Sequence, residues 1–440
     1  MKTKSPTGNK SRNKDRKISD FFSTKILNRL AIKSGFKKRS NSKISAKNLI
    51  LGFMMMVSKK KNTYECWSQE ISLLSGSVIS RQAVEERMRP ETTAMLKLTL
   101  GEEFKKSLHT RATQQVQRKF KHIKLEDSTV LNLPEELSSV FSGNVSGGKK
   151  KSQAKIHALY DFTENAFDFM NLHSFTRNDQ SLSMDSIRYL SQGDLLLRDM
   201  GFPVLDVLDE IETRGAYFIS PKSFQTNVYD PETKEKIDLI KVLSKRGFFD
   251  DEVLVSKKHK KMRLVILPLP SELVAQRKRK ASCDRDKRLN HSSEYYNLLG
   301  YSILITNVPQ TMCSAEEISK LYGLRWQIEI IFKSWKSGFY LVKLAPSKCD
   351  NPERIYCMIY LWLIFIMLFH TLWINHNQAY LRKKANLSIL KLASFFSDYF
   401  PLILIEKNAT KIRKLMLLKC RYDKRNDRIN LMQKYEKIAV

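Results

Sequence analysis

The sequence predicts a mixed α/β protein in which a helical region precedes a sheet and further helices follow it. Apolar residues recur at helical spacing from residue 20 to about residue 118, as in the segment NLILGFMMMV. From residue 119 the pattern changes to alternating and β-branched runs, which are typical of strands. A chain of 440 residues is long enough for two or three domains with a substantial core.

The charge and the cysteines limit the classes of function. The chain has 77 Lys and Arg against 45 Asp and Glu, a net charge of +32, which indicates a polyanionic partner, either nucleic acid or an anionic membrane. Six scattered cysteines form no CxxC pair, so neither a disulfide framework nor a zinc site is indicated. A reducing cytoplasm is the default compartment for such a chain.

Residues 1–19 are basic and polar, with no apolar run behind the charges. We expect a disordered basic arm that can follow phosphates, rather than a secretory signal. In the helical region 20–118, the segment 63–88 is typical of a helix, a glycine turn and a second helix. Ser80 would cap that second helix, which carries Arg81. Both a DNA-binding helix-turn-helix and a plain helical hairpin fit this pattern.

Three strand-like runs open the segment 119–225. The first surrounds Asp127, and the other two are AKIHALYDF and AFDFMNLHSF. Between the first two lies the segment 143–150, GNVSGGKK, which nearly matches a phosphate-binding loop. Lys150 stands where the motif needs Ser or Thr, so we expect a flexible basic loop and no nucleotide.

A short buried strand, residues 195–197, ends near Asp199. Gly201 would make a turn, Pro203 would open a helix through about residue 212, and AYFIS would be the next strand. Asp199 therefore follows the carboxyl end of a strand, where α/β sheets place their chemistry. Asp194, near the start of the same strand, is the alternative.

The segment 226–309 is expected to be mostly β, with the strand-like runs DEVLV, MRLVILPL and YSILITNV. Residues 271–289 are typical of a basic helix. Its run Arg277, Lys278, Arg279 and Lys280 favours a surface that tracks phosphates over a merely solvated face.

The segment 322–338, YGLRWQIEIIFKSWKSG, is typical of a helix with one apolar face, and its polar residues are of types that bind metal ions and phosphate. Ser314 and Glu317 form a possible capping box at the head of the helical segment, and Gly338 is placed to end it in a left-handed conformation. Beside the apolar face runs a polar stripe, in which one carboxylate could hold a divalent cation while its neighbours bind phosphate. A plain amphipathic surface helix is the alternative. The stripe consists of Tyr322, Arg325, Glu329, Lys333 and Lys336.

Residues 355–374 are almost wholly apolar, and they are long enough to cross a bilayer. A helix that is apolar all round can also be the central buried helix of a large α/β domain, which is the interpretation we favour. His370 is then expected to be a core residue. The tail 401–440 is basic and helical in rhythm, with nothing catalytic in it.

The spacing Tyr-x2-Arg-x3-Glu-x6-Lys, residues 322–336, resembles the signature of the DDE transposases of bacterial insertion-sequence family four. Asp127-Ser128-Thr129 and the segment 199–202 resemble the first and second aspartate motifs of that family, and SRQAVEERM resembles its N-terminal region. The resemblance implies a ribonuclease H-like core in two parts, 119–225 and 310–400. A mostly β insertion would interrupt this core, and a helical DNA-binding region would precede it.

The same resemblance assigns the site. It makes Asp127, Asp199 and Glu329 the catalytic carboxylates and the ligands of two metal ions, with Mg²⁺ expected and Mn²⁺ able to substitute. The expected partners are double-stranded DNA, as terminal inverted repeats and target, and a second copy of the chain in a synaptic complex. No membrane partner is expected, and the place is the cytoplasm, at the nucleoid. The DNA contacts would come from Tyr322, Arg325, Lys333 and Lys336 on the segment 322–338 and from Arg81 in the helical region. The net charge adds the basic run Arg277, Lys278, Arg279 and Lys280.

The resemblance implies cleavage at the ends of a mobile element and transfer of those ends into target DNA. Three alternatives stay open from the sequence. An inactive or domesticated relative would bind DNA without cutting it. A nuclease of similar fold would cut without strand transfer. A membrane-associated basic protein would span the bilayer with residues 355–374.

Overall fold

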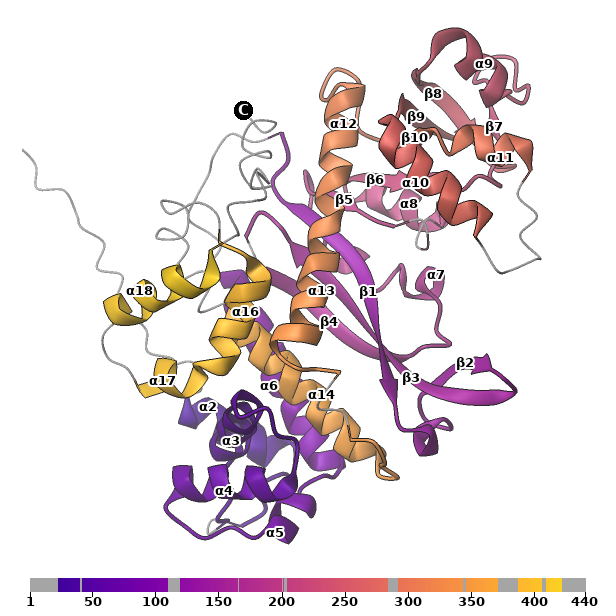
Figure 1. Ribbon diagram of the computed structural model, residues 1–440. Helices are drawn as coiled ribbons and strands as arrows, with labels where there is room; N and C mark the ends of the chain where they lie inside the picture. Colours follow the sequence, from indigo (N-terminus) through magenta and orange to yellow (C-terminus); the bar gives the residue numbers. More distant parts are fainter. Residues whose placement is uncertain are drawn as a thin grey trace, which may run out of the picture.

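A large sheet flanked by helices forms the centre of the protein (Figure 1). The computed structural model describes residues 23–39, 42–109, 119–164, 166–199, 201, 204–283, 292–342, 346–370, 387–405 and 409–421. The predicted arm 1–19 lies outside these residues. The sheet has ten strands in the order β2-β3-β1-β5-β6-β10-β9-β8-β7, and β4 also pairs with β3.

The first five core strands give the order β4-β3-β1-β5-β6. They are β1 (Ile123–Leu133), β3 (Lys149–Asp161), β4 (Ala166–Ser174), β5 (Leu195–Leu197) and β6 (Tyr217–Pro221). The strands β1, β3 and β4 pair antiparallel, whereas β5 is parallel to both β1 and β6. All five strands were predicted. Alternation sends Leu197 to one hydrophobic cluster and its neighbour Leu196 to the other, so both faces of the sheet are covered.

The segment 226–309 extends this same sheet. Its strands are β7 (Val228–Tyr229), β8 (Phe249–Val255), β9 (Lys260–Pro268) and β10 (Tyr301–Thr306), and β10 pairs with both β6 and β9. Three helices accompany them, namely α9 (Leu239–Arg246), α10 (Ser271–Ser282) and α11 (Ser293–Leu298). The basic helix α10 was predicted but α9 was missed. A mostly β segment is therefore present, and its strands join the central sheet edge to edge.

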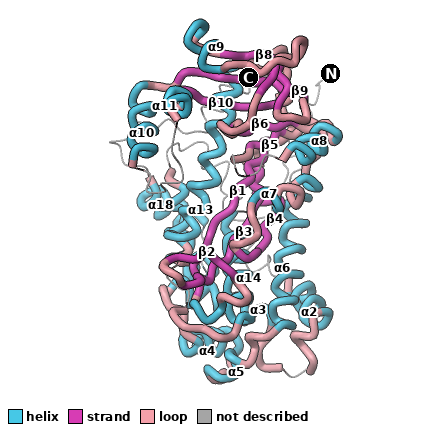
Figure 2. The backbone as a smooth tube through the Cα atoms, turned by 90° about the vertical axis from the view of Figure 1, so that its right-hand side faces the viewer, coloured by secondary structure: helices cyan, strands magenta, loops and turns pink. Residues whose placement is uncertain are grey.

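The N-terminal region is helical, as predicted. It contains α2 (Thr24–Lys33), α3 (Ala46–Ser58), α4 (Tyr64–Ser75), α5 (Arg81–Glu85) and α6 (Pro90–His109). Left-handed Gly76 ends α4, and the Ser80 hydroxyl accepts the N–H of Ala83 to cap α5. The second helix of the expected pair is only five residues long. Figure 2 shows these helices at the opposite end of the molecule from β8 and β9.

The segment 143–150 is a β-hairpin, so the expected flexible loop is wrong. Strand β2 (Ser142–Ser146) pairs with the start of β3, and Gly147 and Gly148 make the turn with φ angles of 61° and 75°. Two consecutive left-handed residues are what a tight hairpin turn requires. The two adjacent glycines therefore indicated a turn of this kind.

The segment that carries Glu329 is a helix in three pieces, α12 (Ala315–Tyr322), a 3-10 turn η3 (Gly323–Arg325) and α13 (Trp326–Gly338). The predicted capping box of Ser314 and Glu317 is confirmed. The predicted left-handed Gly338 is wrong, because the left-handed residue is Tyr340 at φ 55°. Gly338 instead allows α16 (Ile389–Asp398) to approach, since a Cβ there would lie 2.8 Å from the Cβ of Ala393.

Helix α14 (Pro352–Met367) continues as a turn to His370, and it packs against α6 and α3. The stretch Pro352–His370 is long and apolar enough to cross a membrane, and 78% of its most apolar window is buried inside the protein. Length and composition alone do not distinguish a span from a core helix. The burial agrees with the core helix that we favoured. His370 is also buried, among Tyr160, Phe167 and Phe369.

The chain then continues through α16, α17 (Phe400–Ile405) and α18 (Ala409–Cys420). The backbone N–H of Ser388 donates to the Cys420 carbonyl, which ties the start of α16 to the end of α18. The described part of the predicted tail 401–440 is thus helical, as expected, and is packed onto the rest. Its apolar side chains and those of the N-terminal helices belong to one hydrophobic cluster.

Candidate carboxylate active site

Two aspartates come together on adjacent parallel strands, Asp127 within β1 and Asp199 just past the carboxyl end of β5. In the register of β1 and β5, Leu125 lies opposite Leu197. Two residues further along, Asp127 and Asp199 are therefore at the same level and on the same face. The backbone N–H of Ser128 donates to Asp127 Oδ1 at 2.7 Å and fixes that carboxyl group.

Glu329, in the first turn of α13, joins this pair through Arg325. The Arg325 Nη2 atom lies 2.6 Å from Glu329 Oε1, and its Nη1 atom lies 3.5 Å from Asp127 Oδ2. Arg325 is only 5% exposed, because η3 packs against β1. Arg325 was predicted to contact DNA; the structure instead buries it between the carboxylates as a fixed positive charge.

The electrostatics of the cluster show an excess of negative charge. Burial raises the pKa of Asp127 to about 7, and the charges of Asp199 and Glu329 add to this effect. The Ser128 N–H and the Arg325 guanidinium act in the opposite direction. Burial alone would lower the pKa of Arg325, yet its anionic neighbours raise it above the usual range.

This arrangement fits divalent cations. The donor set consists of carboxylate oxygens alone, which is what hard cations such as Mg²⁺ and Mn²⁺ prefer. One guanidinium offsets one charge of three, so cations at this position would relieve the remaining repulsion. Asp127, Asp199 and Glu329 are the residues that could hold them.

The other polar residues of the stripe continue along the same helical segment. Tyr322 lies with its ring 5.9 Å from the Arg325 guanidinium, and burial raises the pKa of its hydroxyl. Lys336 is half-buried, which lowers its pKa, whereas Lys333 is exposed. The two lysines follow Glu329 by one and two turns on the helix.

The remaining predicted DNA contacts lie away from the carboxylates. Arg81 is exposed on α5, and the basic run is exposed on α10, near the opposite end of the molecule (Figures 1 and 2). Arg277 donates through Nη1 to the carbonyl of Tyr301 at 3.1 Å. The structure does not bring these residues into the carboxylate cluster. The exposed run consists of Arg277, Lys278, Arg279 and Lys280.

Asp194, the alternative to Asp199, lies at the other end of β5 and has structural partners. It is fully buried, where Oδ2 lies 3.2 Å from Lys124 Nζ and accepts the N–H of Ser191 at 2.9 Å. Lys124 also contacts Asp168 at 3.0 Å. This buried ion cluster holds the amino ends of β1 and β5 together, so Asp199 is the carboxylate that accompanies Asp127.

The sequence analysis missed a second buried ion cluster directly behind the aspartates. Glu126 and Arg198 precede Asp127 and Asp199, so alternation sends them to the opposite face of the sheet. Arg198 Nε donates to Glu126 Oε2 at 2.5 Å, and Nη2 donates to the Ser183 carbonyl at 2.7 Å. His157 Nε2 lies 2.9 Å from Glu126 Oε1. Glu126, His157 and Arg198 are fully buried.

This cluster connects the strands that carry the two aspartates. The Glu126–Arg198 pair bridges β1 to the end of β5 where Asp199 follows. Two charged residues, each directly before a candidate aspartate, were the signal in the sequence. Only the strand pairing shows that they meet.

A group of two histidines and one aspartate also has the ligand types of a metal site. The candidate ligand atoms of His157, His173 and Asp185 all lie within 4.8 Å of one another. Arg177 Nη1 lies 3.2 Å from His173 Nδ1, and a guanidinium can only donate. The proton of the neutral His173 ring is therefore on Nε2, which faces Asp185 at 3.8 Å. Within the described residues His173 Nε2 has no hydrogen-bond partner at this distance. The Arg177 guanidinium also lies 3.5 Å from Asp185 Oδ2, and its positive charge disfavours a cation in this group.

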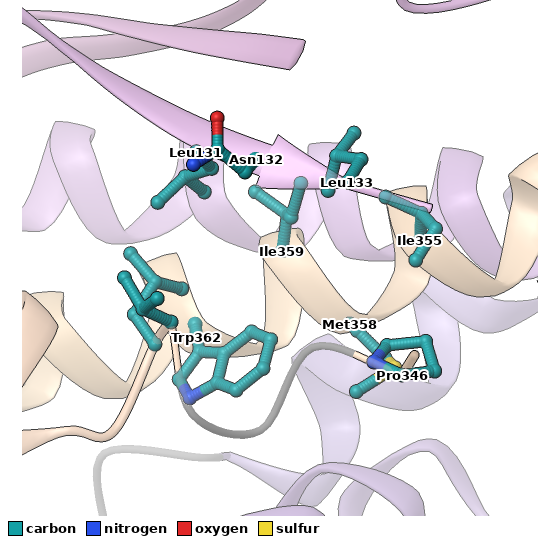
Figure 3. A pocket seen from close by; sticks show the side chains of 10 residues that line it. Leu131, Asn132, Leu133, Pro346, Ile355, Met358, Ile359 and Trp362 are labelled. Atoms are coloured by element: carbon teal, nitrogen blue, oxygen red, sulfur yellow. The ribbon is translucent and has the colours of Figure 1, made fainter. Parts of the chain in front are cut away.

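A small pocket between the end of β1 and α14 is lined almost wholly by apolar side chains (Figure 3). Asn132 is the one polar residue in its lining. None of the three candidate carboxylates borders it. The pocket is therefore a packing feature of the core, separate from the candidate chemistry.

The chain is similar to known transposases over most of its length. A family model described as transposase DDE domain matches residues 119–368. The transposase for insertion sequence element IS231B of Bacillus thuringiensis subsp. berliner is 27% identical over 419 residues, 89% of this chain and 87% of the relative. That for IS231D of B. thuringiensis subsp. finitimus is 28% identical over 443 residues, 94% of this chain and 91% of the relative.

A more distant relative is the transposase for IS1151 of Clostridium perfringens, 26% identical over 88% of this chain and 86% of its own length. Among solved structures, the piggyBac transposase synaptic complex with hairpin DNA covers 92% of this chain and 85% of that chain, with a TM-score of 0.45 and 10% identity. The family match spans 368 − 119 + 1 = 250 of the 440 residues, more than half of the chain. The chain therefore belongs to the transposase DDE domain family.

Proposed function

We propose that Asp127, Asp199 and Glu329 are the catalytic carboxylates of this transposase, an enzyme that cuts DNA at the ends of an insertion sequence and transfers those ends into target DNA. The observation that carries this assignment is the Arg325 guanidinium, which contacts both Asp127 and Glu329 although they are 202 positions apart (329 − 127). An amphipathic surface helix has no reason to aim its carboxylate at an aspartate of the central strand β1 through a buried arginine.

The family implies dependence on a divalent metal, and we propose Mg²⁺, with Mn²⁺ able to replace it. The three carboxylates would hold two cations. When bound, these supply Lewis-acid activation of the attacking hydroxyl and stabilise the leaving oxygen. Arg325 orients Asp127 and Glu329, and its charge opposes the rise that burial causes in the pKa of Asp127. Lys336 and Lys333, on the next turns of α13, would bind the phosphates of the DNA strand that enters the site.

We further propose that the five strands β4-β3-β1-β5-β6 form a ribonuclease H-like core and that the N-terminal helices bind DNA, with Arg81 among their contacts. The exposed cations of α10 support a second DNA-binding surface. A synaptic complex would bring two copies of the chain to two element ends in the cytoplasm, at the nucleoid.

The test is cleavage of end DNA. A 40-base-pair duplex would be taken from an inverted repeat that flanks the reading frame, extended into its flanking sequence, and incubated with the full chain. We expect specific cleavage with Mg²⁺ or Mn²⁺ and none in excess EDTA. Asp127→Asn should abolish cleavage, whereas Asp206→Asn, at an exposed carboxylate paired with Lys258, should not. Specific cleavage in EDTA, or by Asp127→Asn, would contradict the proposal.

A further inference from the structure

The β2–β3 hairpin presents three consecutive lysines in a part of the molecule that the catalytic assignment does not use. Lys149, Lys150 and Lys151 follow the glycine turn directly, and all three are exposed. Within the described residues none of the three forms an ion pair, whereas Lys155 on the same strand is buried and contacts Asp179 at 3.0 Å. The hairpin therefore carries uncompensated positive charge.

The hairpin is held firmly at its base. Gln153 donates through Nε2 to Asn132 Oδ1 on β1 at 2.9 Å, and its Oε1 accepts the N–H of Asn144 at 3.0 Å. The strands are so close at Gly143 that a Cβ there would lie 2.7 Å from the Lys151 carbonyl oxygen. Because the backbone is fixed, a ligand that binds the lysines orders only their side chains, which lowers the entropic cost of binding.

The distance from the catalytic carboxylates sets where this hairpin would meet DNA. Asp127 lies opposite Ala158 on β3. Along β3, Ala158 is 7 residues from Lys151 (158 − 151) and 9 residues from Lys149 (158 − 149). At about 3.3 Å per residue this is roughly 23 to 30 Å. With 3.4 Å between successive phosphates of a strand along the axis of B-DNA, the span corresponds to about seven to nine base pairs.

Two of the elements that position the candidate carboxylates, β1 and α13, run toward the hairpin. Leu133, at the end of β1, lies opposite Ser152. Helix α13 descends from α12 toward the same end of the sheet (Figure 1), so Lys333 and Lys336 lie beyond Glu329 in that direction. Lys333 and Lys336 therefore lie on the side of Glu329 toward which β1 runs to meet the hairpin strand.

We propose that Lys149, Lys150 and Lys151 bind the phosphate backbone of the transposon-end duplex about seven to nine base pairs from the cleaved phosphate. This inference rests on the proposed function, because it takes Asp127 as the site of cleavage. The hairpin would hold the duplex in register by charge without reading its sequence.

The test compares two triple variants with the same loss of charge. The hairpin variant is Lys149→Gln/Lys150→Gln/Lys151→Gln, and the control is Lys241→Gln/Lys245→Gln/Lys257→Gln, which removes three exposed lysines from the far end of the sheet. Binding of the 40-base-pair end duplex would be measured by fluorescence anisotropy across a salt series, and contacts by hydroxyl-radical footprinting. Circular dichroism would check that both variants fold.

We expect the hairpin variant to lower the slope of log K against log[salt] by about two to three units and to lose protection at base pairs seven to nine. The control should keep that protection. Wild-type protection at those base pairs in the hairpin variant, or its loss in both variants, would overturn the proposal. Footprinting needs no turnover. If the wild-type chain binds the duplex without cutting it, the catalytic assignment is refuted. The footprint then still tests whether the hairpin contacts the DNA.

Discussion

The buried pair behind the aspartates allows one perturbation to be worked out in detail. Arg198→Met keeps the length and much of the volume of the side chain but removes the guanidinium that contacts Glu126 at 2.5 Å. The Glu126 carboxylate would then remain fully buried with His157 as its polar side-chain neighbour. Removing one partner of such a pair costs about 3–5 kcal/mol of unfolding free energy, because a buried charge loses its compensation.

The same reasoning gives the control and the compensating change. Arg214→Met breaks an exposed pair with Glu210, whose side chains are 36% and 37% accessible, and should cost less than about 1 kcal/mol. The double variant Glu126→Leu/Arg198→Met removes both charges. It should recover at least about 2 kcal/mol relative to Arg198→Met alone, since no buried charge is left unpaired.

The assay is urea unfolding of the full chain, followed by tryptophan fluorescence for the wild type, both single variants and the double variant. If Arg198→Met costs no more than Arg214→Met, the buried pair does not stabilise the strand ends as we infer. If the double variant is less stable than Arg198→Met, the loss comes from packing and not from an uncompensated charge.

Three further predictions use other parts of the molecule. Gly338→Ala should lower the unfolding free energy by about 1–3 kcal/mol in urea titrations, because its Cβ would lie 2.8 Å from that of Ala393; unchanged or greater stability would contradict this close approach. Burial lowers the pKa of His370 to about 3, so wild-type stability should fall as the pH drops below about 6.5, and unfolding curves of His370→Phe should lack this component. Lys336→Ala should reduce the salt slope of DNA binding by about one unit in anisotropy titrations, and an unchanged slope would exclude a phosphate contact.

The sign of the pH prediction follows from which state binds the proton. His370 is 1% exposed and neither ring nitrogen has a hydrogen-bond partner within the described residues, so the folded protein favours the neutral ring. The unfolded chain takes up a proton near pH 6.5, and protonation therefore favours unfolding between that pH and about 3. A pH dependence that persists unchanged in His370→Phe would assign the effect to other groups.

Local patterns predicted the elements that hold the carboxylates. The capping box at Ser314 and the buried strand Leu195–Leu197 depend on neighbouring residues alone, and both are confirmed. Helix α9 is only eight residues long and its apolar residues lie within its first five, a run too short for its period to distinguish a helix from a strand. The pairing of β10 with β6 also has no local signal, because any hydrophobic strand can extend a sheet.

In the candidate site, too, local patterns predicted individual residues, whereas the contacts between them depend on packing. The sequence could name Asp127 from a family-like motif inside a strand and Asp199 from its position just past a strand, but it could not show that Arg325 is buried between Asp127 and Glu329. That contact depends on how η3 packs against β1. Gly338 is a similar case, because a glycine near the end of a helix suggests a left-handed cap. Only the position of α16 shows that a glycine is needed there to let the two helices approach closely.

The central claim is that the helix α13 contributes a catalytic carboxylate, and Glu329→Gln tests it most directly. The substitution keeps the size of the side chain and an oxygen that can accept the Arg325 hydrogen bond, so folding should barely change. A gel shift and a cleavage assay on the same end duplex should show near wild-type binding and at least about a hundredfold slower cleavage, equivalent to roughly 2.7 kcal/mol of transition-state stabilisation. Near-normal cleavage by Glu329→Gln would mean that α13 is only an amphipathic helix beside the sheet, and it would contradict the assignment of the three carboxylates.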